Sequence, residues 1–166
     1  MKDAANHVLD EAGAVAMQYA TTEGFDPLRE KIAVRMKAKY AIDTVPQQIL
    51  ITNGSQQGLD FSAKLFLDEG DVVLFESPSY MGAFNAFKAY QPKFMEVPTD
   101  EDGMIPSELE KILETTERVK MIYVIPDFQN PTGRTWSLER RKAFMEIINK
   151  YDIPVIEDNP YGELRY

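Results

Sequence analysis

The feature that most constrains this chain is an alternation of short apolar runs with longer segments of helical periodicity. The apolar runs predict strands at 49–51, 72–75, 94–97, 121–125 and 154–156, and the predicted helices between them cover about 55–68, 79–90, 107–115 and 138–151. Each intervening segment is long enough to connect parallel strands. We therefore expect an α/β fold with a mainly parallel sheet and flanking helices, whose ligands bind outside the carboxyl ends of the strands.

Two further helices are predicted before this alternation. Residues 4–19 repeat apolar side chains at spacings of three and four, which predicts an amphipathic helix. A second helix is expected to start with Asp26 as its N-cap and Pro27 in its first turn. At 166 residues, the chain is long enough for one domain with a core.

Charge and composition exclude several classes of function. The 27 acidic and 18 basic residues give a net charge of −9, which argues against a nucleic-acid partner. The chain has no cysteine, and His7 is its only histidine, without an evident nucleophile nearby. No run of about 20 apolar residues and no secretory signal is present, so we expect a protein that does not enter the membrane and is cytoplasmic.

The segment after the first predicted strand favours an anion site. Gly54, Ser55 and Gln56 lead directly into a helix, whose first N–H groups are free and lie at the positive end of the helix dipole. The segment is neither a Walker loop nor a dinucleotide fingerprint. A tight turn in which Ser55 only caps the helix fits these residues as well.

The second and fourth predicted strands deliver further candidates to the same edge of the sheet. Tyr80 follows the second strand and could stack on a flat heterocycle, or could simply pack against its neighbours. Asn130 follows the fourth strand; Pro131 restricts its backbone and Gly133 releases the chain, so its amide is expected to lie over the crevice. The sequence Asn-Pro-Thr-Gly also fits a plain polar turn.

The fifth predicted strand places Asp158 at its carboxyl end, where a carboxylate needs a cation. A protonated ring nitrogen at about 4 Å would gain roughly 4 kcal/mol at an effective dielectric near 20, or about three pKa units in favour of the protonated ring. Tyr161 could donate to an oxygen of the same ligand. The other interpretation of Asp158 is an ordinary helix cap.

Together these motifs resemble the class I/II aminotransferases of pyridoxal phosphate fold type I, and most closely the 2-aminoadipate, kynurenine and aromatic aminotransferase group. The quoted motifs, which span nearly the whole chain, are Tyr19, Gly54-Ser55-Gln56, Ser77-Pro78-Ser79-Tyr80, Asn130-Pro131-Thr132-Gly133 and Asp158-Asn159-Pro160-Tyr161. The resemblance implies a partial large domain, with amino-terminal helices at 1–40 and a cofactor-binding part at 41–166 that is incomplete at its carboxyl end and lacks the later strands and the small domain.

The resemblance also implies roles for individual residues. Gly54, Ser55 and Gln56 would hold the phosphate of pyridoxal 5'-phosphate, and Tyr80 would stack on its ring. The other implied contacts are Asn130 and Tyr161 to the phenolic oxygen, Asp158 to the ring nitrogen, and Tyr19 to the cofactor of the neighbouring subunit in a homodimer. The substrates would be an amino acid and a 2-oxo acid, between which the family transfers an amino group.

One family residue is expected outside this sequence. The Schiff-base lysine lies beyond Tyr166 in the family pattern, so we expect no catalytic residue within this chain and expect the chain alone to be inactive. Two alternatives stay open: an aminotransferase-like sensor domain of a transcriptional regulator, and a non-catalytic fragment. Because the family's intervening strands are absent, the first and fifth predicted strands must leave open edges or find new partners.

Overall fold

The computed structural model describes residues 1–164, which form two compact units, Met1–Asn53 and a second one that begins at Gly54. The second unit contains a four-stranded parallel sheet in the order β2-β1-β5-β6. Its strands are β1 (Val72–Glu76), β2 (Lys93–Val97), β5 (Val119–Val124) and β6 (Val155–Glu157). A separate antiparallel pair, β3 (Thr99–Asp100) and β4 (Gly103–Met104), was not predicted from the sequence.

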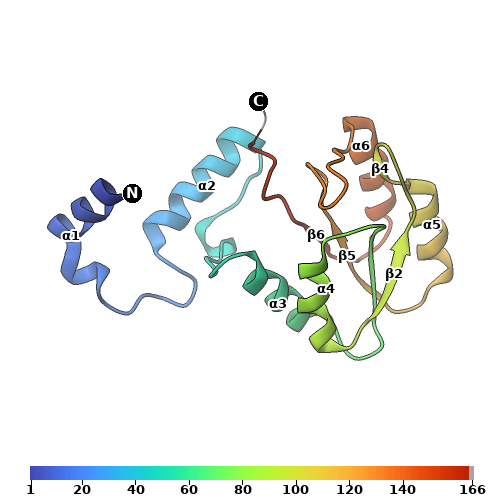
Figure 1. Ribbon diagram of the computed structural model, residues 1–166, viewed down its shortest axis with the longest axis horizontal. Helices are drawn as coiled ribbons and strands as arrows, with labels where there is room; N and C mark the ends of the chain where they lie inside the picture. The colour runs from blue at the N-terminus through green and yellow to red at the C-terminus, as the bar shows by residue number, and fades with distance from the viewer. Residues whose placement is uncertain (165–166) are drawn as a thin grey trace. The chain divides into compact units, whose positions relative to one another are not determined.

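Helices cover both faces of this sheet (Figure 1). One face packs on α5 (Pro106–Thr115) and α6 (Leu138–Ile148), and the other packs on α3 (Ser55–Phe66) and α4 (Met81–Phe87), which continues into the short 3-10 helix η2 (Lys88–Tyr90). Alternate residues of a strand therefore enter different cores: in β5, Ile122 packs toward α5 and α6, whereas Tyr123 packs toward α3 and α4. The predicted α/β fold with four of its five strands is confirmed.

The predicted strand at 49–51 is wrong. The 3-10 helix η1 (Pro46–Gln48) precedes it, and the residues after η1 pair with no strand among those described. Their backbone groups bind local partners instead: the N–H of Ile51 donates to the carbonyl of Glu23 at 2.9 Å, and Nε of Arg29 donates to the carbonyl of Ile49 at 2.9 Å. An apolar run becomes a strand only beside another strand.

Of the two alternatives predicted for the fifth strand, an open edge or a new partner, the described residues show the open edge. β6 pairs with β5 through Ile122, Tyr123 and Val124, and it has no second neighbour within residues 1–164. The carboxyl end of this edge strand leads directly to Asp158.

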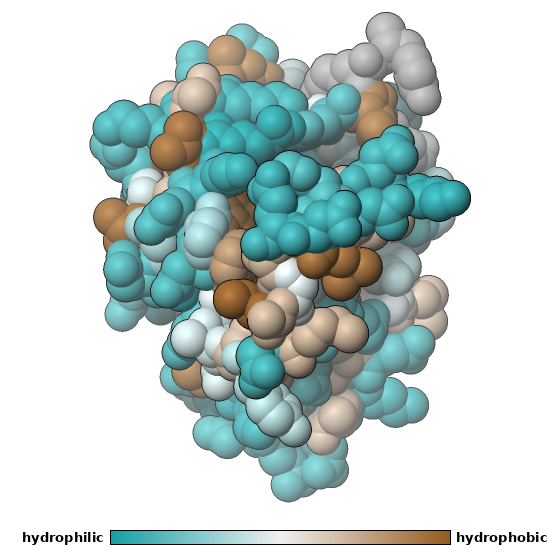
Figure 2. Space-filling model, turned by 90° about the vertical axis from the view of Figure 1, so that its left-hand side faces the viewer, coloured by the Kyte–Doolittle hydropathy of each residue, from teal (hydrophilic) through white to brown (hydrophobic). Residues whose placement is uncertain are grey.

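The amino-terminal unit contains α1 (Lys2–Ala16) and α2 (Asp26–Tyr40). α1 bends at Ala12, and none of its residues is buried. Asp26 is the first residue of α2 rather than its cap; the N-cap is Phe25, and the Asp26 carboxylate pairs with Nη1 of Arg29 at 2.7 Å. Figure 2, in which the side that carries α1 faces the viewer, shows hydrophobic side chains exposed between hydrophilic ones.

Candidate cofactor site

A hollow of about 130 Å³ lies at the carboxyl ends of β5 and β6, beside the first residue of α3. It is lined by Ser55, Tyr80, Ile125, Asn130, Asp158, Pro160 and Tyr161. Five of the eight residues predicted from the sequence therefore meet in one place, although more than a hundred residues separate the first from the last. The other three, Tyr19, Gly54 and Gln56, are not among the residues that line it.

The corner at the start of α3 depends on Gly54. Its φ of +84° lies in the region that side chains disfavour, so glycine makes the turn into the helix without strain. Gly54 itself occupies the N-cap position, which leaves Ser55 as the first helical residue rather than the cap. Gln56 does not line the hollow. Its Nε2 donates to the carbonyl of Gly82 at 2.9 Å and so connects α3 to the start of α4.

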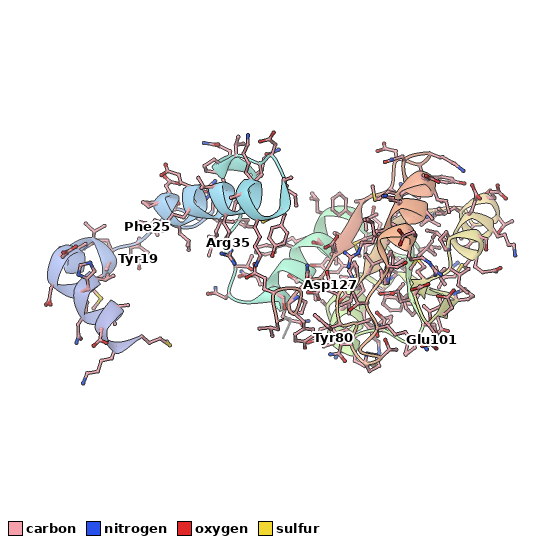
Figure 3. The ribbon with its side chains drawn as sticks, turned by 90° about the horizontal axis from the view of Figure 1, so that it is seen from above. Tyr19, Phe25, Arg35, Tyr80, Glu101 and Asp127 are labelled. Carbon is pink, nitrogen blue, oxygen red and sulfur yellow. The ribbon has the colours of Figure 1, made fainter. Side chains whose placement is uncertain are left out.

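Tyr80 forms one wall of the hollow from the residue before α4 (Figure 3). Its side chain is half-buried and packs against the core beneath α3 and α4. The ring fits closely over Gly82: a Cβ atom at that position would lie 2.3 Å from the ring. Any larger residue at position 82 would therefore displace the aromatic wall.

Asn130 lies on a loop that is closed on itself and fastened to the opposite wall. The N–H of Gln129 donates to the carbonyl of Arg134 at 2.8 Å, and its side-chain amide donates to the carbonyl of Pro78 at 2.7 Å. The other side-chain atom of Gln129, Oε1, accepts from both the N–H and the hydroxyl of Thr132. These bonds hold the backbone on either side of Asn130, which keeps its side chain at the hollow.

Asp158 is held at two points. Its backbone N–H donates to the carbonyl of Val124 at 2.9 Å, and its Oδ2 accepts from the hydroxyl of Tyr123 at 2.7 Å. Burial and the neighbouring Asp158 carboxylate raise the pKa of Tyr123 far above its ordinary value, so this hydroxyl keeps its proton and remains the donor. The second oxygen of Asp158 remains for another donor.

Sequence reasoning missed Tyr123, although one signal could have found it. It is the only residue with a polar side chain among the four residues 121–124 of a buried strand, and a buried tyrosine hydroxyl normally requires a partner. Its partner lies 35 residues away in the sequence, so only the sheet register identifies Asp158.

A second unpredicted residue, Glu76, binds Ile125, which lines the hollow. Its carboxylate is 2% exposed, and it accepts from the N–H of Ile125 at 2.9 Å and from Nε1 of Trp136 at 2.8 Å. Burial raises the pKa of Glu76, and these two donors offset part of that rise. Glu76 thereby joins the strand before Tyr80 to the residue that ends the loop of Asn130.

Tyr161 lies at the hollow, whereas Tyr19 belongs to the amino-terminal unit. Tyr161 lines the hollow with 38% of its surface exposed. Tyr19 lies in the amino-terminal unit, fully exposed, on the segment between α1 and α2 that also carries Phe25 (Figure 3). There it lines an apolar hollow of about 620 Å³ together with side chains of α1.

The donor set fits pyridoxal phosphate. A carboxylate, an aromatic face, an amide, a phenol and the first residue of a 12-residue helix surround one hollow, which suits a flat cationic ring with an anionic arm. Among the described residues no lysine lines the hollow, and no group of acidic or histidine side chains could hold a metal ion. Within the same residues, no helix is both long and apolar enough to cross a membrane.

Comparison with known proteins identifies the family. The family model for aminotransferase class I and II matches residues 1–166. Aromatic-amino-acid aminotransferase 1 of Thermococcus litoralis is 45% identical over 96% of this chain and 39% of its own length. For 2-aminoadipate transaminase of Thermus thermophilus, the identity is 44% over 99% of this chain and 40% of the relative. This chain thus spans about two fifths of the relatives that it matches.

A solved structure gives the same result for the fold. Kynurenine aminotransferase of Pyrococcus horikoshii superposes with a TM-score of 0.93 and 41% identity, over 99% of this chain and 42% of that one. The parallel sheet with helices on both faces is therefore part of the large domain of fold type I. The chain belongs to the class I and II aminotransferase family.

Proposed function

We propose that the protein containing this chain is a pyridoxal phosphate-dependent aminotransferase, which transfers an amino group from an amino acid to a 2-oxo acid. The observation that carries the proposal is the carboxylate of Asp158, which is fixed by Tyr123 and lines the same hollow as Ser55. The solved relative from Pyrococcus horikoshii is described as a complex with PMP, the amino form of this cofactor. The names of the relatives favour an amino donor with a long or aromatic side chain, which a donor screen of the whole protein would test.

Each residue around the hollow has a distinct task in this proposal. Asp158 accepts a hydrogen bond from the protonated ring nitrogen, and Tyr80 covers one face of the ring. The amide of Asn130 and the hydroxyl of Tyr161 donate to the phenolic oxygen.

In this proposal, the phosphate binds at the turn that precedes α3. The N–H groups of the first turn of the helix and the hydroxyl of Ser55 bind it, with Gly54 and Gln56 shaping the turn. When bound, pyridoxal phosphate supplies an electron sink for removal of the α-proton of the amino acid. The residues of this chain hold and orient the ring for that chemistry.

The amine that must bind the cofactor covalently is assigned to a lysine outside this sequence. None of the residues that line the hollow carries an amino group, so none can hold the cofactor aldehyde as a Schiff base. The 166-residue chain alone is accordingly expected to bind the cofactor without turning over substrate.

The assembly proposed for the whole protein is a homodimer in which Tyr19 reaches the phosphate bound by the neighbouring subunit. Tyr19 is fully exposed and lies beside an apolar hollow, and α1 buries none of its side chains within one chain. Exposed apolar surface of this kind is typical of protein interfaces. Sedimentation equilibrium of the whole protein tests this assembly, and a monomer at high concentration would contradict it. The cytoplasmic location stays a prediction for cell fractionation.

Pyridoxamine 5'-phosphate is the probe that tests the site, because it carries its own amine and needs no lysine. We expect the chain to bind it in isothermal titration calorimetry, and we expect Asp158→Asn to weaken binding at least about tenfold, since an amide offers no charge to the ring nitrogen. Asp152→Asn is the matched control, because Asp152 is an exposed carboxylate close by in the chain. Absence of binding by the unmodified chain, or equal affinity of the two variants, would overturn the proposal.

A further inference from the structure

Tyr123 lies beneath the proposed cofactor site and does not line it. The side chain is 1% exposed near the carboxyl end of β5, and its ring packs edge-on against Phe87 with centroids 5.7 Å apart. Two residues further along the same strand direction, Ile125 forms part of the hollow itself. Both residues belong to the core under α3 and α4, so Tyr123 reaches the hollow only through its hydroxyl.

The sheet register explains why that hydroxyl meets Asp158. Tyr123 is the register partner of Ile156 on β6, and Ile156 packs into the same core. Because strand residues alternate between faces, Asp158 lies on the same side as Ile156, two residues closer to the carboxyl end. The long side chain of Tyr123 reaches from the level of Ile156 to Asp158, and its hydroxyl donates to Oδ2 of Asp158 at 2.7 Å.

We propose that Tyr123 is a positioning residue for the contact between Asp158 and the ring nitrogen. Its hydroxyl occupies Oδ2, so Oδ1 becomes the oxygen that accepts from the ring, and rotation of the carboxylate about its Cβ–Cγ bond is blocked. Phenylalanine at this position would fill the same core space and leave the carboxylate free to rotate. The role rests on the proposed function of the site, because it presumes a ring nitrogen opposite Asp158.

Other groups near Tyr123 do not replace this role. Glu76 on β1 and Tyr80 before α4 both lie close enough to raise the pKa of Tyr123 further, but neither makes a hydrogen bond to the Asp158 carboxylate. Asp158 has one further fixed contact, its backbone bond to Val124, which leaves the carboxylate itself unrestrained. Tyr123 is thus the side chain that orients this carboxylate.

The chain offers a matched control for this pair. Tyr90 donates to Oδ1 of Asp60 at 3.0 Å, which is the same chemistry in the same unit, and neither residue lines the hollow. Tyr90→Phe therefore removes a tyrosine–aspartate hydrogen bond without touching the proposed site. Tyr123→Phe removes the one that orients Asp158.

The experiment uses pyridoxamine 5'-phosphate labelled with ¹⁵N at the ring nitrogen. Tyr123→Phe should weaken its binding several-fold and move the ¹⁵N resonance of the bound ring, because that resonance reports the hydrogen bond at the nitrogen. Tyr90→Phe should do neither. In the Asp158→Asn background, Tyr123→Phe should add no further loss of affinity, since the group it orients is already neutral.

The outcomes separate this inference from the function on which it rests. If the unmodified chain does not bind the probe, the proposed function fails. If it binds, and Asp158→Asn weakens binding while Tyr123→Phe behaves like Tyr90→Phe in both readouts, the positioning role alone is overturned. Should Tyr123→Phe fail to fold, 3-fluorotyrosine at position 123 keeps the packing and strengthens the donor; an unchanged ¹⁵N resonance would then overturn the role.

Discussion

The two ends of β1 each carry a buried carboxylate, and their environments shift the pKa in opposite directions. Asp71, just before the strand, is 3% exposed and binds the guanidinium of Arg118 at 2.8 Å and the N–H of Asp68 at 2.8 Å. The bond from Asp68, followed by Arg118, lowers the pKa of Asp71 against the effect of burial. Glu76, at the other end, binds two neutral N–H donors, and burial raises its pKa.

These opposite pKa shifts indicate that the amino end of β1 contributes mainly to stability, whereas its carboxyl end supports the proposed ligand site. At the amino end, a cation compensates the buried charge and closes the loops between strands. At the carboxyl end, Glu76 is buried without that compensation, yet it joins Ile125 and Trp136, which begin and end the loop of Asn130. Burial of this acid is unfavourable, but its two hydrogen bonds hold together the residues around the hollow.

The largest effect expected from this comparison follows Glu76→Ala. The change leaves the indole N–H of Trp136 and the N–H of Ile125 buried without acceptors, at about 1–3 kcal/mol each, so we expect a loss of roughly 2–6 kcal/mol in the free energy of unfolding. Urea unfolding at neutral pH measures it.

The control for Glu76→Ala is Glu157→Ala, because Glu157 ends the edge strand β6 of the same sheet with an exposed side chain. Surface substitutions of this kind usually change stability by less than about 0.5 kcal/mol. If Glu76→Ala were no more destabilising than the control, Glu76 would not connect the two walls, and the contrast between the ends of β1 would disappear.

A smaller effect, opposite in sign at the two ends, is expected in the pH dependence of stability. The folded pKa of Asp71 lies below its ordinary 3.8, so Asp71 stabilises the fold above that pH and loses this contribution as the pH falls through the folded pKa. The stability difference between the unmodified chain and Asp71→Asn should therefore shrink on acidification. Arg118 is largely exposed, which keeps the share of the ion pair small.

Glu76 should show the reverse trend. Its folded pKa lies above its ordinary 4.5, so its contribution is fully present below that pH and is lost as the pH rises through the folded pKa. The stability of the unmodified chain relative to Glu76→Gln should then fall as the pH rises above 4.5. Urea midpoints of the three proteins, taken at pH values from below 3.8 to well above 4.5, measure both trends. Parallel slopes for the two variants would refute the assigned environments.

Much of the fold followed from sequence because the apolar runs and helical stripes agree with the local structure. Four strands and all six longer helices form close to where they were predicted, and Ser137 caps α6. The run at 49–51 failed because the sequence cannot say whether an apolar segment has a neighbouring strand. β3 and β4 were missed because two residues carry no periodicity.

For the site too, features that follow from the local sequence were predicted, and features that depend on a distant partner were missed. Tyr80, Asn130, Asp158 and Tyr161 could be predicted because each follows a strand at the end where parallel sheets bind ligands. Ser55 could be predicted because it begins a helix directly after a glycine, although the strand expected before it does not form. Tyr123 and Glu76 were missed: each belongs to a buried strand, and the sequence does not show which distant group it binds. What distinguishes them is a polar atom whose partner is supplied by a distant strand or loop, and that partner is visible only in three dimensions.

The double attachment of Asp158 has a mechanical consequence. Both fixed contacts of this residue, one from its backbone and one from its side chain, end on β5, which has a strand on each side. A load applied to the carboxylate is thus carried by the interior of the sheet and not by the three-residue edge strand that precedes it. Fraying of that edge would have to break two bonds of different kinds before the carboxylate could drift.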